Sequence, residues 1–86
     1  MLNFHFQSLR TNLLELIELI KNDLPAKDIK EALEFVEYNE FGCSFELICT
    51  QLFEYDAKLS DDIYNKIESI GQSMNLNEKV WKILKN

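Results

Sequence analysis

The chain has 86 residues, 47% of them apolar, with 15 acidic and nine basic residues and a net charge of −6. A chain of this length builds one modest core, so a single domain spanning residues 1–86 is expected. Its acidity argues against direct binding of nucleic acid or an anionic membrane. No run of about 18 apolar residues would cross a bilayer, and no secretory signal is apparent at the N-terminus. A cytoplasmic location is therefore expected.

The first predicted element is a helix over residues 4–23. Its apolar residues recur at alternating spacings of four and three, which is typical of a helix with one buried stripe. Leu14 and Leu19 lie beside the stripe and predict that this helix packs on more than one side. The stripe consists of Leu2, Phe6, Leu9, Leu13, Leu16, Ile20 and Leu24.

The second predicted helix covers residues 25–38. The residue before a proline avoids the helical region, so Pro25 ends the first helix, and proline is well tolerated where the next one begins. After this helix, Asn39 or Gly42 is expected to take the left-handed conformation that closes a helix. The residues expected to face inward are Ile29, Leu33 and Val36, with Ala32 and Phe35 adjoining.

Three further helices are predicted over residues 43–55, from the N-cap Ser60 to about residue 75, and over residues 77–84. No segment alternates apolar and polar residues as a half-buried strand does. The fold class is therefore all-α, a small single-domain bundle of four to five helices. The apolar face of the third helix is predicted to contain Phe41, Phe45, Ile48, Leu52 and Tyr55, extended by Cys49 and Phe53.

The chain carries no recognisable catalytic or metal-binding motif. Its one histidine, His5, has no sequence partners for a catalytic triad. Cys43 and Cys49 point about 240° apart on a helix, so they neither bridge nor share a metal. Glycine-rich phosphate loops, zinc motifs and calcium loops are absent from the sequence. We therefore expect no enzymatic activity, no cofactor and no metal site.

Negative charge is concentrated in the middle of the chain. Nine acidic residues lie between Glu31 and Asp62 with a single basic residue, Lys58, giving this span a net charge of −8. Such a concentration costs self-repulsion and suits a positively charged partner. Some of these acids have local explanations. Glu31 and Glu34 follow lysines by four residues, Asp62 precedes Lys66 by four, and both Asp61 and Asp62 occupy the start of a helix.

The other five acids have no cation in helical register on their own helix. On the third helix, Glu46 and Glu54 share a polar arc with Leu47 at its edge, which predicts an exposed apolar anchor among charges. Tyr55 is a second candidate anchor. The alternative is that another helix covers Leu47 and the acids only keep the protein soluble. The predicted binding surface comprises Glu37, Glu40, Glu46, Leu47, Glu54, Tyr55 and Asp56.

The central segment resembles the MafI-type immunity proteins. The similarity is carried by EYNEFG at residues 37–42, FELIC at residues 45–49 and QLFEYD at residues 51–56. It continues through Leu59-Ser60 to Trp81 and covers about residues 32–84. The matched polar or special positions are Asn39, Glu40, Gly42, Glu46 and Glu54.

Such immunity proteins are small, acidic and helical, and occur in bacteria that carry polymorphic or contact-dependent toxins. Each binds the C-terminal domain of its cognate toxin and blocks it. The resemblance implies an immunity protein that is a monomer when free and forms a 1:1 complex with a basic toxin domain, an EndoU-like or other RNase. An acidic surface suits this role because an RNase has a basic substrate groove.

Two alternatives stay open on the sequence. The chain would also suit an acidic helical adaptor or regulatory module that binds a basic protein with no toxin involved. A homo-oligomeric structural protein, assembled through the wide apolar surface of the first helix, is the third hypothesis.

Overall fold

The computed structural model describes residues 2–85, with side chains from residue 5 onward. Within that range it contains five helices and no strand, which confirms the all-α class. The helices are α1 (Leu2–Ile20), α2 (Ala26–Glu37), α3 (Phe41–Glu54), α4 (Asp61–Ser73) and α5 (Lys79–Lys82).

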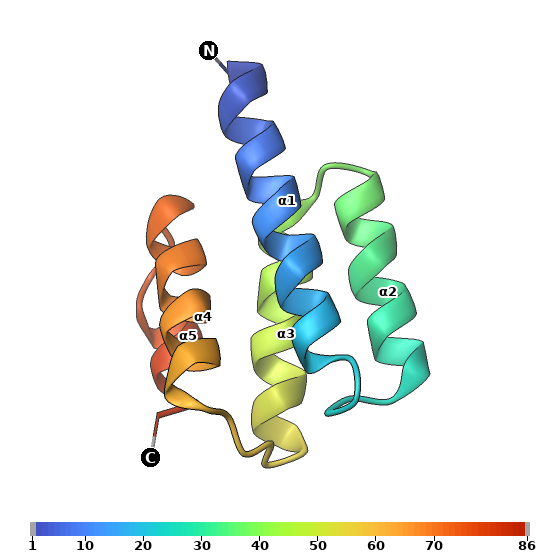
Figure 1. Ribbon diagram of the computed structural model, residues 1–86, viewed down its shortest axis with the longest axis vertical. Coiled ribbons are helices and arrows are strands. Elements are labelled where there is room, and N and C mark those ends of the chain that lie inside the picture. The colour runs from blue at the N-terminus through green and yellow to red at the C-terminus, as the bar shows by residue number, and fades with distance from the viewer. Residues whose placement is uncertain (1, 86) are drawn as a thin grey trace.

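The first three helices run alternately down and up, and the N-terminal turns of α1 project beyond the rest of the bundle (Figure 1). The α2–α3 hairpin is the most extensive helix pair, and α1 packs against α2, α3 and α4. The short α5 packs on α3 and α4. The acidic middle of the chain therefore folds mainly as one hairpin, with α1 on its inner side.

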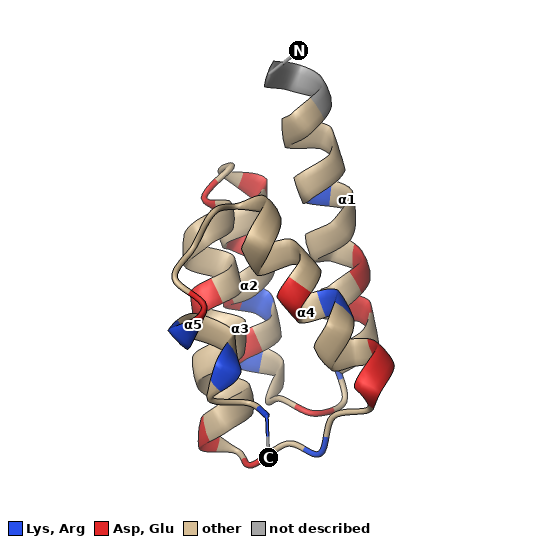
Figure 2. Cartoon of the chain, turned by 90° about the vertical axis from the view of Figure 1, so that its left-hand side faces the viewer, with Lys and Arg blue, Asp and Glu red and all other residues tan. Residues whose placement is uncertain are grey.

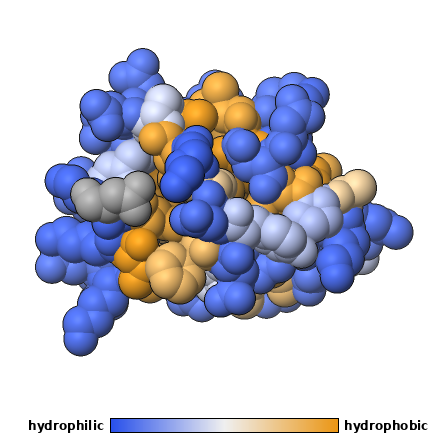
Figure 3. All heavy atoms as spheres, turned by 90° about the horizontal axis from the view of Figure 1, so that it is seen from below, coloured by the Kyte–Doolittle hydropathy of each residue, from blue (hydrophilic) through white to orange (hydrophobic). Residues whose placement is uncertain are grey.

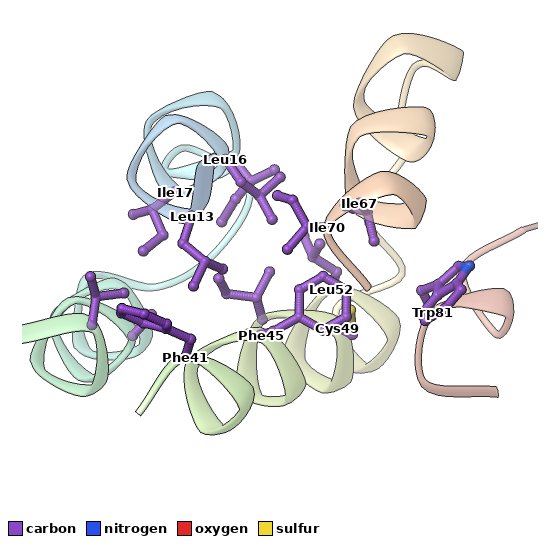
Figure 4. Close-up of a cluster of buried hydrophobic side chains, with 14 of the residues drawn as sticks. Leu13, Leu16, Ile17, Phe41, Phe45, Cys49, Leu52, Ile67, Ile70 and Trp81 are labelled. Carbon is purple, nitrogen blue, oxygen red and sulfur yellow. The ribbon is translucent and has the colours of Figure 1, made fainter. Parts of the chain in front are cut away.

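The core lies where α1, α3 and α4 meet (Figure 4). The predicted stripe is buried from Leu9 to Leu24, which lies just after α1, while Leu2 lies outside the residues whose side chains are described. Phe6 is largely exposed because it sits on the projecting turns, although its ring meets the Phe41 ring edge-on at 5.8 Å between centroids. The fully buried large side chains include Leu13, Leu16, Ile20, Phe45, Ile48, Leu52, Ile67 and Ile70.

Several apolar residues predicted to be buried are exposed. The first helix does pack against several helices, as predicted, but not through Leu14 and Leu19, which face outward. Leu33 and Phe53 are also exposed, each one residue after a buried one. One residue is about 100° of helix rotation, so a small error in the predicted orientation of α2 or α3 moves a side chain from core to surface.

Three helices end in the same way. Asn39, Asp56 and Asn75 have positive φ angles of 63°, 51° and 57°. In each case the next residue donates its N–H to the carbonyl five positions earlier, at 2.8–3.1 Å, which is the Schellman arrangement. Asn39 therefore closes α2, while Gly42 lies inside the first turn of α3. Ser60 caps α4 as predicted, accepting an N–H at 3.2 Å.

Arg10 of α1 holds the α2–α3 turn in place. Its guanidinium donates to the Val36 carbonyl at 2.9 Å and to Oδ1 of Asn39. Its Cζ also lies 5.4 Å from the centroid of the Phe41 ring, a cation–π arrangement. This half-buried side chain thus fixes the backbone on which the neighbouring acidic residues stand.

Two buried polar side chains join α2 to α3. Ser44 donates its hydroxyl to the Ala32 carbonyl at 2.9 Å. Asp28, in the first turn of α2, accepts from Nε2 of Gln51 at 3.0 Å, at a helix end that favours an anion. This carboxylate has a structural partner and is not part of the acidic surface.

Gly71 makes room for Trp81 of α5. The Trp81 side chain is 2% exposed, and its ring centroid lies 6.3 Å from that of Phe45. A Cβ placed on Gly71 would lie 2.3 Å from Cζ3 of Trp81. The bare backbone of α4 at Gly71 is therefore what lets α5 pack closely.

Candidate protein-binding surface

The predicted surface residues lie on the α2–α3 hairpin but do not form one cluster. Glu37 and Glu40 stand at one end of the hairpin, whereas Glu54 and Asp56 stand at the other. Since α3 has 14 residues, these ends are about 20 Å apart, with Glu46 exposed between them. Acidic segments accordingly appear at both ends of this pair of helices in Figure 2. A partner would have to span the length of α3 to contact them all.

The two predicted apolar anchors behave differently. Leu47 is partly buried and packs against the core, so it is not the fully exposed anchor that was expected. Tyr55 is 50% exposed and stays accessible. Near it along the chain, Phe53 is exposed too and shares a small hollow with Ile83. Figure 3 shows hydrophobic surface among hydrophilic side chains at this end of the molecule.

Two lysines pair differently from what the sequence suggests. Lys58 lies 3.6 Å from Oδ2 of Asp56, a pair only two residues apart and so outside the helical register in which no cation was predicted. Both side chains are highly exposed, so this ion pair contributes little. Lys66, expected to pair with Asp62, instead binds Oε1 of Glu15 on α1 at 2.9 Å.

Glu31 and Glu34 do not form the ion pairs with Lys27 and Lys30 that the sequence predicts. Within the part of the chain that the structure describes, no lysine or arginine nitrogen lies within 4.0 Å of either carboxylate. Lys27 and Lys30 precede these glutamates in the chain, which is the less favourable order for a helical pair at this spacing. Both carboxylates therefore join the acidic surface.

The helix dipole stabilises some of the acidic residues and destabilises others, depending on which end of a helix they occupy. The first turn of α4 holds Asp61 and Asp62, where the dipole favours anions. Glu37 and Glu54 instead end α2 and α3, whose last turns contain no basic residue, and Asp56 follows two residues later. The dipole disfavours anions at a helix C-terminus. The fold gives no stabilising reason for the carboxylates of Glu37 and Glu54.

A groove on the outer side of α2 brings acids and aromatic rings together. It has a volume of about 340 Å³, and we call it the α2 groove. Four of its residues recur at three- and four-residue spacing along one face of α2, and Tyr38 is 72% exposed. This groove was not predicted, because Phe35 was expected to adjoin the core. The lining residues are Glu31, Glu34, Phe35, Tyr38 and Glu40.

Both cysteine thiols have a raised pKa. Cys43 is exposed and donates to Oε1 of Glu40 at 3.7 Å. Desolvation, with the nearby charges of Glu40 and Glu46, raises the pKa of its thiol. Burial is the main cause that raises the pKa of Cys49 to about 12. The reactive thiolate is therefore disfavoured at both positions.

Alkylation is expected to separate the two thiols. In the native protein at pH 8, iodoacetamide should modify Cys43 slowly and Cys49 only after unfolding, as followed by mass spectrometry. Because the unfolded Cys49 thiol loses its proton near 9.0 and the folded one near 12, the free energy of unfolding should fall as pH rises above 9. Equal reaction of both thiols in the native state would contradict this assignment.

Replacing Asp56 with glycine is expected to stabilise the protein. The change relieves a positive φ of 51° and removes an anion from the C-terminal end of α3. We expect urea denaturation to show a gain of about 0.5–1 kcal/mol. Asp56→Asn removes only the charge and should give part of that gain. A loss of stability in both variants would show that the Lys58 pair matters more than the helix dipole.

The described residues contain no cluster of three or more histidine, cysteine or acidic side chains that would hold a metal ion. Among the same residues, no helix has the length and apolar character needed to cross a membrane. Comparison with protein-family models, with curated proteins and with solved structures finds no significant match.

Proposed function

We propose that the protein is an immunity protein that binds a cognate basic toxin domain, an EndoU-like or other RNase, through the acidic surface of α2 and α3. One observation carries the proposal. Glu37 and Glu54 stand at helix C-termini where the dipole opposes them and where no cation accompanies them in the last turn. Residues that lower stability where they stand are expected at functional sites. A cationic partner would remove the cost at both ends of the hairpin.

The physical match is between this surface and an RNA-binding groove. An enzyme that cleaves RNA needs cationic side chains to hold phosphates, and these groups are what an acidic protein covers. Opposite charges also steer the two proteins together and speed their association. The exposed rings of Tyr38 and Tyr55, one at each end of the hairpin, supply the apolar contact that charges alone do not.

In this proposal the protein acts by binding alone, as a monomer in the cytoplasm that forms a 1:1 complex. The rival homo-oligomer would use exposed leucines of α1. Leu14 and Leu19 are five residues apart, hence about 140° apart around the helix, and do not form one seam. The adaptor alternative differs only in the partner, and gene context separates it, because an immunity gene should follow a toxin gene directly.

The deciding experiment is co-expression with the product of the preceding gene. We expect a 1:1 complex by size-exclusion chromatography with light scattering, and loss of that product's RNase activity when this protein is added. Affinity should fall as salt rises, since exposed charge pairs are screened. A neighbour that is neither basic nor bound would remove the proposal.

A further inference from the structure

We infer that the α2 groove receives one arginine side chain of the basic partner, with its guanidinium over the Tyr38 ring and its N–H groups on the surrounding carboxylates. This inference rests on the proposed function only in that the partner is basic. It assigns a specific task to Glu31 and Glu34, for which the four-residue spacing had predicted local pairs with lysines.

The groove matches a long side chain with an apolar stem and a cationic head. Its volume of about 340 Å³ accommodates such a chain, and half-buried Phe35 offers apolar surface for the methylenes. Glu31, Glu34 and Glu40 place carboxylates around it. The Tyr38 ring, 72% exposed, leaves a π face free for a cation.

Arginine fits these walls better than lysine. A guanidinium is planar, stacks on aromatic rings and binds carboxylates through two parallel hydrogen bonds. A lysine ammonium is a more strongly hydrated point charge and loses more on leaving water. At the same turn the protein already places one guanidinium over an aromatic ring, since Arg10 lies over Phe41 while it donates to Asn39.

The groove is formed before any partner arrives. The Tyr38 N–H donates to the Glu34 carbonyl at 3.1 Å, and the following Asn39 is held by Arg10. The backbone that carries the ring is therefore fixed by α1. A preformed site avoids the entropic cost of ordering its own backbone on binding.

The probe that tests this is N-acetyl-arginine amide, titrated into the 15N-labelled full chain and followed by NMR. We expect shifts confined to the C-terminal half of α2 and the turn after it. The lysine analogue should bind more weakly, and the uncharged citrulline analogue should not bind. Shifts spread evenly over all acidic residues, or equal binding of citrulline, would overturn the inference.

Two variants and a matched control sharpen the result. Tyr38→Ala should weaken arginine binding at least fivefold, a loss of about the size that a cation–π contact supplies. Tyr38→Phe keeps the aromatic ring and should therefore retain arginine binding. Leu33→Ala changes another exposed residue of α2 (41% exposed) outside the groove and should leave binding unchanged. Equal affinity of Tyr38→Ala and the parent protein would refute the role of the ring.

The same variants distinguish this inference from the proposed function. If Glu54→Lys abolishes binding of the co-purified toxin while Tyr38→Ala has no effect on it, the groove assignment fails and the proposed function stands. If the groove binds arginine but no basic toxin partner exists, the proposed function fails and the groove assignment stands.

Discussion

Replacing Gly71 with alanine is expected to lower the free energy of unfolding by about 1–3 kcal/mol, although alanine is the better helix former. The new Cβ would lie 2.3 Å from Cζ3 and 2.4 Å from Cε3 of Trp81. These distances are too short for two carbon atoms, and a buried indole ring has no room to turn aside. The helix α5 must therefore shift away from α4. For a domain with a total stability of roughly 4–13 kcal/mol, such a loss is large.

Urea denaturation followed by the fluorescence of the single tryptophan measures both stability and the Trp81 environment. Displacement should shift the native emission to longer wavelength. The matched control is Gly42→Ala in the first turn of α3, where nothing lies within 4 Å of the added Cβ. This control should stabilise the protein by about 0.5–1 kcal/mol. Equal behaviour of the two alanine variants would refute the proposed contact.

Reversing the charge of Glu46 and Glu54 together is expected to separate binding from stability. Affinity for the toxin domain should fall by at least about 2 kcal/mol, roughly 30-fold, because carboxylates paired with partner cations are replaced by like charges. Folding stability should instead rise slightly, since Glu54→Lys places a cation at the C-terminus of α3. A lower affinity for the toxin together with a higher folding stability would show that these glutamates serve binding and not folding.

The control is Glu18→Lys, which makes one charge reversal of the same kind on α1, outside the α2–α3 hairpin. Glu18 pairs with exposed Lys21, and such surface pairs contribute little. Calorimetric titration at two salt concentrations, with urea denaturation of each variant, gives the comparison. If the Glu46/Glu54 double variant bound the toxin as the parent protein does, the acidic surface would not be the interface.

The helices were predictable because each is encoded locally. The apolar stripe of α1, the proline before α2 and the Ser60 cap of α4 act within a few residues of the elements they define. The rotation of each helix about its axis is set by packing partners distant in sequence. Leu33 and Phe53 were therefore assigned to the wrong side, each by one residue.

The candidate site was predictable in charge but not in arrangement. The sequence shows which residues are acidic, but the pairing of Lys66 with Glu15 joins positions 51 residues apart. Likewise, the sequence left open whether Leu47 is exposed or packs on the core, and it gives no sign that Gly71 accommodates Trp81. The α2 groove was missed because it depends on Phe35 turning only partly inward.

The three Schellman endings have a consequence for how the chain folds. Each reversal at Asn39, Asp56 and Asn75 is specified by hydrogen bonds between residues at most five positions apart. The chain can therefore make these turns before its distant parts meet, and little loop-closure entropy opposes the search. Proteins dominated by such short-range contacts fold on the microsecond to millisecond scale. A nascent chain of this kind would reach its native shape soon after synthesis, with its carboxylates already displayed.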